Sequence, residues 1–351
     1  MALIPHPNTR VEVLHGCAIE ELDLEPDGSV QMCVTSPPYF GLRSYLPEGH
    51  PMKRYEIGTE KTPREYVAKL VQVFRAVRRV LADDGTLWLN LGDSYNAYNA
   101  NRGASTGFSD GKDGRDRPTA ERGLTVPKLG NKQLLGVPWR VAFALQDDGW
   151  YLRQDIIWSK PNPMPESVRD RCTKAHEYIF MLSKKPRYYF DAEAIRNPPS
   201  EALLKQVAEG YNGSDTKDFS EAGAQSASGT KARIIDNARK KIDKQRGHER
   251  SHDGFKGKWD QMTRAEQMML GSNKRSVWTV ATAPFKGSHF ATFPPELIRP
   301  CILAGSRPGD TVLDPFGGSG TTGMVARQEG RNALLCELNA DYLPLIQQRT
   351  A

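Results

Sequence analysis

The chain has 351 residues, of which 38% are hydrophobic, enough to bury one large core or two modest ones, and its net charge of +6 fits a polyanionic partner. No apolar run is long enough to cross a bilayer, and the first residues lack the basic and then apolar pattern of a signal peptide, so we expect a cytosolic protein. The five cysteines form no CxxC pair, which predicts reduced thiols rather than a disulfide framework or a metal site.

The first predicted elements are two short strands that lead to a proline-containing motif. Residues 11–16 and 29–34 are predicted as strands, and the second one would place Thr35 at its carboxyl end. Pro37 and Pro38 then stop this strand, because a proline cannot donate to a sheet ladder. We therefore expect the motif to begin at a strand tip.

A helix and another strand are predicted next. From residue 62 to residue 82, apolar side chains recur at three- and four-residue spacings, which indicates a helix with one buried face. Residues 83–85, Asp-Asp-Gly, are expected to end that helix, and residues 86–91 are predicted as a buried strand. The order strand, helix, strand is typical of an α/β protein.

The central part continues this pattern after a polar interruption. Residues 96–132 are rich in Gly, Ser, Asn and Asp, and we expect a mobile surface loop there. Residues 137–145 are predicted as a helix, and residues 151–158 and 177–182 as strands, with the proline-rich segment 160–165 between them. Alternating units of this kind predict a mixed or parallel sheet covered by helices on both faces.

Residues 197–275 interrupt the pattern with Gly, Ser, Lys and Arg, and no core can be assigned to them from sequence. Between residues 231 and 258, ten Lys or Arg residues stand against four acidic residues. Two interpretations stay open: a solvated helix and linker, which is the commoner fate of a charge run, or an insert that contacts nucleic-acid phosphates. The basic residues that would make such contacts are Arg239, Lys240, Lys241, Lys244 and Arg246.

The C-terminal part returns to α/β character. A helix is predicted at residues 295–304, ending at Gly305, and a strand follows at residues 311–314. A second helix is predicted at residues 320–330 and a second strand at residues 332–337. This arrangement places a glycine-rich segment between a strand and a helix.

That segment has the spacing of a nucleoside-binding loop. Gly318, Gly320 and Gly323 match G-x-G-x-x-G, in which glycines let the backbone approach a ligand closely. Glu337 follows at about the twenty-residue offset expected of a carboxylate that grips ribose hydroxyls. The context favours either NAD or S-adenosylmethionine. Asp314, at the strand tip, would repel the pyrophosphate of a dinucleotide and attract the ammonium and sulfonium region of S-adenosylmethionine.

The segment Thr35-Ser-Pro-Pro-Tyr39 has groups that suit the activation of an amine on a nucleic-acid base. Such an amine is a poor nucleophile because its lone pair is delocalised into the ring. The Ser36 hydroxyl and the Pro37 carbonyl would accept its hydrogens and favour a pyramidal nitrogen. The Tyr39 ring would stack on a base withdrawn from the duplex. Taken alone, however, these residues are better explained by a strand end followed by a core tyrosine.

Together, Thr35-Ser-Pro-Pro-Tyr39 and Asp314-Pro-Phe-Gly-Gly-Ser-Gly320 resemble the catalytic and cofactor motifs of the amino-group DNA methyltransferases. Residues 289–294 are similar to that family's third cofactor-binding segment, and the order of the motifs resembles the β-class, circularly permuted members of the N4/N6 family. The resemblance implies a Rossmann-like, S-adenosylmethionine-dependent α/β fold with a mixed, mostly parallel sheet and a polar basic insert for target recognition. It covers roughly residues 11–92, 135–195 and 276–349.

The resemblance also assigns roles to residues. Residues 1–196 would form the catalytic part of one domain, residues 276–351 its cofactor-binding part, and residues 197–275 the target-recognition insert. The catalytic loop would consist of Ser36, Pro37, Pro38 and Tyr39. The cofactor-binding residues of the glycine-rich loop would be Asp314, Phe316, Gly317, Gly318, Ser319, Gly320 and Thr321. Glu337 would hold the ribose. The residues that close over the cofactor would be His289, Ala291 and Phe293.

The expected reaction follows from the first residue of the catalytic tetrad. In this family Ser tends to accompany cytosine N4 and Asp adenine N6, so Ser36 favours site-specific methylation of cytosine N4 in double-stranded DNA, with adenine N6 as the alternative. A more remote alternative is a DNA-binding protein of the same fold that has lost catalysis. The chain would act in a bacterial or phage-infected cell as a monomer or homodimer, with a cognate restriction endonuclease as a candidate partner.

Other classes explain fewer features. A cytosine C5 methyltransferase would need a cysteine nucleophile, usually after a proline, but Cys301 lies in an apolar, helix-like run where a small buried thiol is the commoner explanation. An NAD-linked oxidoreductase would explain the glycine-rich loop but leave residues 35–39 and the basic run without roles. RNA or a protein amide would be chemically similar substrates, although the family's amide-modifying relatives tend to have Asn where Ser36 stands.

Overall fold

The computed structural model describes residues 9–42, 44–96, 126, 129–163, 165–201, 204–205, 269–282 and 293–351. Its contacts divide the chain into two units, one formed by Met1–Ile195 with Arg275–Ala351 and the other by Arg196–Lys274. The predictions that lie outside the described residues concern most of the loop at 96–132, the basic residues Arg239, Lys240, Lys241, Lys244 and Arg246, and the cofactor-closing residues His289 and Ala291.

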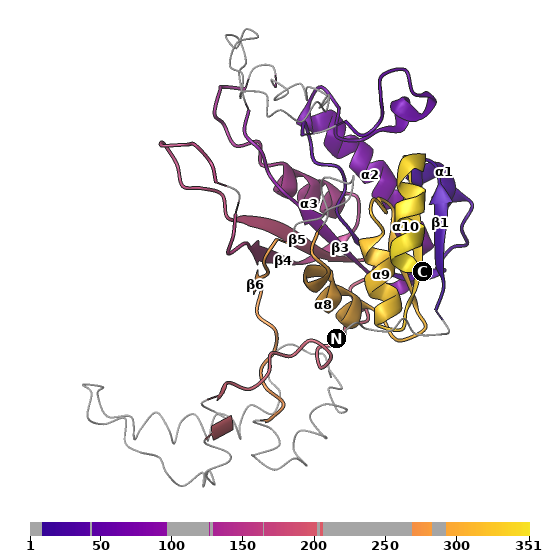
Figure 1. The fold of residues 1–351 in the computed structure, drawn as a ribbon, viewed down its shortest axis with the longest axis vertical. Coiled ribbons are helices and arrows are strands. Elements are labelled where there is room, and N and C mark those ends of the chain that lie inside the picture. Colours follow the sequence, from indigo (N-terminus) through magenta and orange to yellow (C-terminus); the bar gives the residue numbers. More distant parts are fainter. Residues whose placement is uncertain are drawn as a thin grey trace, which may run out of the picture. The chain divides into compact units, whose positions relative to one another are not determined.

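The larger unit is built around a mixed sheet flanked by helices (Figure 1). Its described strands run in the order β1-β8-β7-β2-β3-β5-β4-β6. These strands are all parallel to one another except β5, which is antiparallel to its neighbours β3 and β4. The prediction of a mixed, mostly parallel sheet is confirmed. The strands are β1 (Val11–His15), β2 (Val30–Thr35), β3 (Leu81–Leu91), β4 (Tyr151–Ser159), β5 (His176–Ser183), β6 (Val277–Thr279), β7 (Thr311–Asp314) and β8 (Asn332–Glu337).

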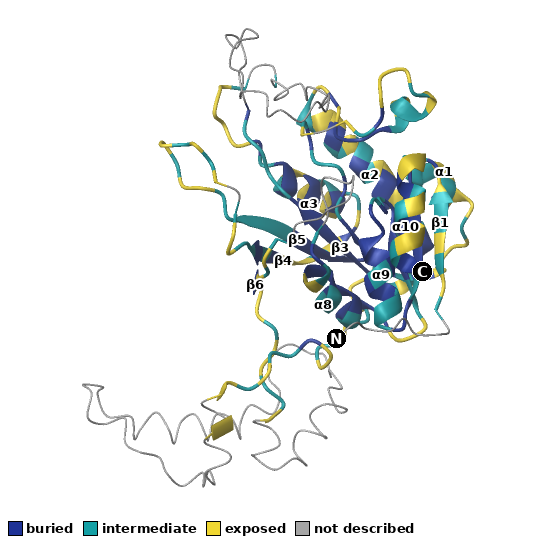
Figure 2. Cartoon of the chain, viewed as in Figure 1, coloured by how far each residue is buried: buried dark blue, intermediate teal, exposed yellow. Residues whose placement is uncertain are grey.

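Helices cover both faces of this sheet, and each face has its own buried core (Figure 2). Leu89 of β3 packs in the first core with Phe74 of α2, whereas its neighbour Trp88 packs in the second with Ile298 of α8. Successive strand residues point to opposite faces, so one strand supplies both cores. The helices of the first face are α1 (Ala18–Asp23), α2 (Pro63–Val80) and α3 (Val137–Asp147), and those of the second are α8 (Pro295–Gly305), α9 (Thr321–Gln328) and α10 (Leu343–Thr350).

The start of α2 follows from its sequence. The Thr62 hydroxyl accepts a hydrogen bond from the Glu65 amide at 3.2 Å, and the Glu65 carboxylate accepts one from the Thr62 amide at 3.0 Å. This reciprocal capping satisfies amide groups that the first helical turn leaves without partners, and Pro63 suits the first helical position because it has no amide to satisfy. The buried face of the helix is formed by Tyr66, Leu70, Val73, Phe74, Ala76, Val77 and Val80.

The predicted end of this helix is wrong. We expected residues 83–85 to end it, but α2 stops at Val80 and β3 begins at Leu81. Leu81 is fully buried and pairs with Val30 of β2, and the register of this strand pair then shifts. A Cβ atom on Gly85 would lie 2.9 Å from two carbonyl oxygens. The Asp-Asp-Gly segment is thus an irregularity inside a longer strand rather than a turn.

The other predicted strands and helices end within two residues of their expected bounds. Within the described part of the chain, the elements that the sequence did not indicate are short: α1, β6, α10 and the 3-10 helices η1 (Pro51–Tyr55) and η3 (Ala340–Tyr342). All five cysteines are free thiols, as predicted. Among the described helices, none combines the length and apolarity needed to span a membrane.

Candidate active site

A cavity of about 1170 Å³ lies at the carboxyl ends of β2, β7 and β8. Both sequence motifs contribute to its walls, because β2 and β7 are neighbours in the sheet and their tips lie side by side. Of the predicted site residues that the structure describes, Gly320 alone does not line the cavity. Those that line it are Ser36, Pro37, Pro38, Tyr39, Phe293, Asp314, Phe316, Gly317, Gly318, Ser319, Thr321 and Glu337.

The two motifs are joined through the Asp314 carboxylate, a residue that is 2% exposed. One of its oxygens accepts hydrogen bonds from the Thr35 hydroxyl at 2.6 Å and the Phe316 amide at 3.0 Å, and the other accepts one from the Thr322 hydroxyl at 2.6 Å. Burial raises the pKa of Asp314 to about 6, and these hydrogen bonds oppose the rise. Asp314 therefore fixes the start of the glycine-rich loop against the end of β2; its attraction for a cationic ligand stays a prediction.

The glycine-rich loop is held against β8 by its backbone. The Gly317 amide donates to the Cys336 carbonyl at 2.7 Å, and a Cβ atom on Gly317 would lie 3.2 Å from that oxygen. Gly320, with φ of 77°, caps α9 in the left-handed conformation that favours glycine. Arg349 of α10 donates to the Ser319 carbonyl at 2.8 Å. At this loop the cavity wall is therefore formed partly by glycine backbone, which a bound ligand can approach closely.

Glu337 ends β8 at the edge of the cavity and is 8% exposed. Its two oxygens accept hydrogen bonds from the backbone amides of Gly318 and Asn339, both at 2.7 Å. Burial raises the pKa of Glu337 to about 7, although the two amides lower it. Because a carboxylate has about four lone-pair sites, these two bonds leave capacity for the hydroxyl groups of a ligand.

The loop Ser36–Tyr39, which is predicted to be catalytic, is packed against Tyr66 and two glycines. The Tyr66 hydroxyl of α2 donates to the Pro38 carbonyl at 2.8 Å. A Cβ atom on Gly58, whose φ is 101°, would lie 3.1 Å from the Tyr39 carbonyl oxygen, and one on Gly92 would lie 2.6 Å from the Tyr39 ring. A larger residue at Gly92 would therefore displace the Tyr39 ring.

The wall beside the Tyr39 hydroxyl is made of residues that no motif indicated. This hydroxyl donates to Glu177 at 2.6 Å and lies 3.2 Å from Asn90 Oδ1. The Lys160 ammonium pairs with Glu177 and lies 4.3 Å from the centre of the Trp158 ring. Burial, and then the nearby Glu177 carboxylate, raise the pKa of Tyr39 well above its usual range. The sheet register explains the grouping, since β4 and β5 pair with Trp158 opposite Glu177.

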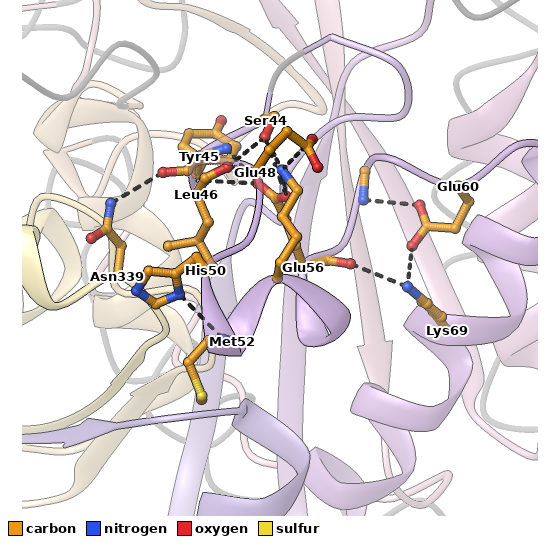
Figure 3. Close-up of polar contacts among 12 residues, drawn as sticks. Ser44, Tyr45, Leu46, Glu48, His50, Met52, Glu56, Glu60, Lys69 and Asn339 are labelled. Carbon is orange, nitrogen blue, oxygen red and sulfur yellow. Dashed lines mark hydrogen bonds and ion pairs between the residues drawn. The ribbon is translucent and has the colours of Figure 1, made fainter.

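A polar cluster holds the segment that follows the catalytic loop (Figure 3). Glu56, which is 3% exposed, accepts hydrogen bonds from the backbone amides of Tyr45 and Leu46 and pairs with Lys53 at 2.7 Å. Asn339, whose own amide binds Glu337, donates to the Tyr45 carbonyl at 3.2 Å. The cluster thereby links the Glu337 side of the cavity to the chain that follows the catalytic loop.

Cys301 lies away from this cavity. It is fully buried in α8 within the second core, and its thiol contacts the Leu297 carbonyl at 3.7 Å. The predicted burial of this thiol in the core is confirmed.

Comparison with known protein families identifies the family of this chain. A model for N6 and N4 methyltransferases, described as DNA methylase, matches residues 30–348. The chain belongs to this DNA methylase family. The methylase is 41% identical over 337 residues to the Type II methyltransferase M.Cfr9I of Citrobacter freundii, an alignment that covers 96% of this chain and 86% of that one. It is 42% identical over 332 residues to the Type II methyltransferase M.SmaI of Serratia marcescens, covering 95% and 87%.

Solved structures share its fold. The cytosine-N4-specific PvuII DNA methyltransferase superposes with a TM-score of 0.56 at 16% identity, covering 98% of this chain and 87% of that one. A putative DNA modification methylase of Thermus thermophilus, solved with S-adenosyl-L-methionine, gives a TM-score of 0.51 at 21% identity, covering 98% and 95%. The predicted Rossmann-like methyltransferase fold is confirmed.

Proposed function

We propose that this DNA methylase transfers a methyl group from S-adenosylmethionine to the N4 amino group of a cytosine at a specific site in double-stranded DNA. One observation carries the proposal. The Ser36 hydroxyl and the glycine-rich loop line the same cavity, and the 2.6 Å hydrogen bond from Thr35 to Asp314 fixes one motif against the other. An acceptor for amino hydrogens and a site for the methyl donor thus lie at neighbouring strand tips.

The glycine-rich side of the cavity fits S-adenosylmethionine, which supplies an electrophilic methyl group when bound. Glu337 offers a buried carboxylate to the ribose hydroxyls, and Gly317 and Gly318 line the cavity beside it. The nearly buried Asp314 adds negative potential for a cationic ligand. A cavity of about 1170 Å³ is also larger than the roughly 300 to 1,000 Å³ of common ligand pockets, so it can hold both a donor and a base.

The opposite side suits an amino group. Ser36 Oγ and the Pro37 carbonyl would accept the two amino hydrogens and direct the nitrogen lone pair towards the methyl group, so that the chain accelerates transfer mainly by positioning. The Tyr39 ring would stack on the flipped base. Because Glu177 holds the Tyr39 hydroxyl at 2.6 Å, the ring is oriented before a base arrives.

The choice of cytosine rests on Ser36, by resemblance to the N4-specific members of the family. A protein of the same fold, the PvuII methyltransferase, is named as cytosine-N4-specific, which agrees with this choice. Adenine N6 is the alternative target, since its amine needs the same acceptors.

We assign target recognition to the insert at residues 197–275. Its basic residues between Arg239 and Arg246 would contact the DNA phosphates. Residues 1–196 and 276–351 would form the methyltransferase domain. The methylase would act in the cytoplasm as a monomer or homodimer. Because relatives such as M.SmaI are named Type II methyltransferases, a cognate restriction endonuclease is the candidate partner.

The proposal is tested by following tritiated methyl groups from S-adenosylmethionine onto DNA, RNA and protein in parallel reactions. We expect label on double-stranded DNA and none above background on RNA or protein, with Ser36→Ala as the inactive control. If the wild-type protein binds S-adenosylmethionine but labels no DNA, the proposed function is wrong.

A further inference from the structure

A chain of hydrogen bonds leads away from the amino-group acceptor. The Ser36 hydroxyl donates to the Tyr39 oxygen at 3.5 Å, and the Tyr39 hydroxyl donates to Glu177 Oε2 at 2.6 Å. The Lys160 ammonium occupies Oε1 of the same carboxylate. The two hydroxyl groups thus point their hydrogens in one direction, from Ser36 towards Glu177.

Glu177 is placed to receive a proton from this chain. Among the described residues, it is the acid that hydrogen-bonds to a residue of the catalytic loop, whereas Asp314 is engaged by Thr35 and the glycine-rich loop. Its side chain is 15% exposed and lines the cavity, so water can later remove a proton from it.

The proposed reaction requires such an acceptor. When the N4 lone pair forms the new N–C bond, sulfur keeps the electron pair of the breaking S–C bond. The nitrogen then carries the methyl group, both of its original hydrogens and a positive charge. One proton must leave to give the neutral methylated base. The hydrogen bonds from Ser36 to Tyr39 and from Tyr39 to Glu177 offer that proton a defined path.

We propose that Glu177 is the terminal proton acceptor for methyl transfer, reached through Ser36 and Tyr39; the inference rests on the proposed function. The N4 proton moves to Ser36 Oγ, the Ser36 proton moves to the Tyr39 oxygen, and the Tyr39 proton moves to Glu177 Oε2. Both hydroxyl groups end neutral. The positive sulfonium and the negative carboxylate present at the start are replaced by a neutral thioether and a neutral acid, so charge balances.

Glu177 acts through Tyr39 and is a positioning residue rather than a catalytic one. Its negative charge also stabilises the positive charge that develops on N4. The titratable groups that face it are Tyr39, Lys160 and Lys174, while the adjacent His176 contacts Tyr178. Lys174 donates to the Asp93 carbonyl at 2.7 Å, and burial lowers its pKa.

The test compares single-turnover rates of the full-length protein on unmethylated phage lambda DNA with tritiated S-adenosylmethionine. We expect Glu177→Gln and Tyr39→Phe each to slow transfer about 10- to 100-fold, because positioned proton transfer contributes about this much or more. The double variant should be no slower than the slower single variant, since both break one path. Glu177→Asp should regain part of the rate, because it restores a carboxylate.

Glu166→Gln is the matched control. Glu166 lies in the connection that leads from β4 to β5 and pairs with Arg171 at 2.6 Å, but it does not line the cavity, so its neutralisation should leave the rate within about twofold. A measurement that needs neither methyl donor nor DNA is the NMR chemical shift of Tyr39 ¹³Cζ. This resonance is assigned by its disappearance in Tyr39→Phe. It should shift in Glu177→Gln and not in Glu166→Gln.

The proposed proton path from Ser36 through Tyr39 to Glu177, the relay, is overturned if Glu177→Gln transfers methyl groups as fast as wild type. It is also overturned if the rate losses of Glu177→Gln and Tyr39→Phe multiply in the double variant. It is also overturned if the slowing is explained entirely by weaker binding of S-adenosylmethionine in calorimetry. Absence of label in wild-type reactions would contradict the proposed function itself, whereas normal labelling by both wild type and Glu177→Gln would contradict the relay alone.

Discussion

The two walls of the active-site cavity are held in different ways. On the cofactor side, the glycine-rich loop is fixed by bonds to the next strand, such as Gly317 to the Cys336 carbonyl and Gly318 to Glu337, which is 19 residues away. On the proposed base side, the Tyr39 hydroxyl donates a hydrogen bond to Glu177, which is 138 residues away and is the second residue of the antiparallel strand β5.

This difference determines how substitutions in each wall should affect the protein. It also determines how much of each wall can be predicted from the amino-acid sequence. A loop built from neighbouring segments has a recognisable spacing, and changes to it should affect the binding of the methyl donor. A wall assembled from distant strand ends depends on sheet register, and changes to it should affect the rate of transfer.

The largest effect is expected on the base side. Ser36→Ala removes an acceptor for the amino hydrogens, so we expect the single-turnover rate to fall about 100-fold or more. The dissociation constant of S-adenosylmethionine, measured by calorimetry, should change less than about twofold. Equal losses in rate and in donor affinity would show that the two walls do not act separately.

The converse effect is expected on the cofactor side. Glu337→Ala removes the carboxylate proposed to hold the ribose, and we expect the dissociation constant of the donor to rise about 10- to 100-fold, the value of hydrogen bonds to a charged group. The rate at saturating donor should stay close to that of wild type. An unchanged dissociation constant would contradict the ribose role.

Glu337 also predicts how donor binding depends on pH. Its pKa of about 7 in the free protein means that the ionised acceptor is lost as pH falls through 7, so affinity should fall about tenfold for each pH unit below that value. Glu337→Gln should bind more weakly at high pH and show a flatter profile. A wild-type affinity that rises on acidification would reverse the expected sign.

The raised pKa of Glu337 affects the stability of the free protein in the opposite direction: stability should fall as pH rises. Because folding raises the pKa of Glu337 from its ordinary 4.5 to about 7, its contribution to the free energy of unfolding is fully present below about 4.5 and is lost as pH rises through 7. Urea unfolding at pH 5.5 and pH 8 should show this loss in wild type and a smaller one in Glu337→Gln.

Two glycine-to-alanine substitutions, each adding one methyl group, distinguish the effects of the two cavity walls on transfer rate and on donor affinity. Gly92→Ala would bring a Cβ atom to 2.6 Å from the Tyr39 ring, so we expect the transfer rate to fall about tenfold with donor affinity retained. Gly317→Ala would bring one to 3.2 Å from the Cys336 carbonyl, so donor affinity should fall instead. The separation fails if both variants change the same constant.

The smallest effect is expected from the basic run in the insert. Replacing Arg239, Lys240 and Lys241 with glutamine should weaken DNA binding several-fold at low salt and reduce the slope of log affinity against log salt by up to about 0.9 for each lost phosphate contact. Fluorescence anisotropy at several salt concentrations measures this slope. If the slope does not change, the run is a solvated surface.

The amino-acid sequence predicted the features that depend on local periodicity. It did not predict the features that depend on contacts between residues far apart in the chain. The apolar spacing of α2 and the position of the glycine-rich loop were evident, because each is set by neighbouring residues. The early start of β3 was missed, since Leu81 becomes strand only by pairing with Val30. Glu177 and Lys160 were missed for the same reason: no motif surrounds them, and they meet Tyr39 only after β4 and β5 pair.

Methylation of cytosine N4 is tested most directly by mass spectrometry of the nucleosides obtained from unmethylated DNA after incubation with the protein and S-adenosylmethionine. We expect N4-methyldeoxycytidine in the wild-type reaction and about 100-fold less with Ser36→Ala. N6-methyldeoxyadenosine alone would contradict the assignment of cytosine, and the absence of any methylated nucleoside would contradict the proposed activity.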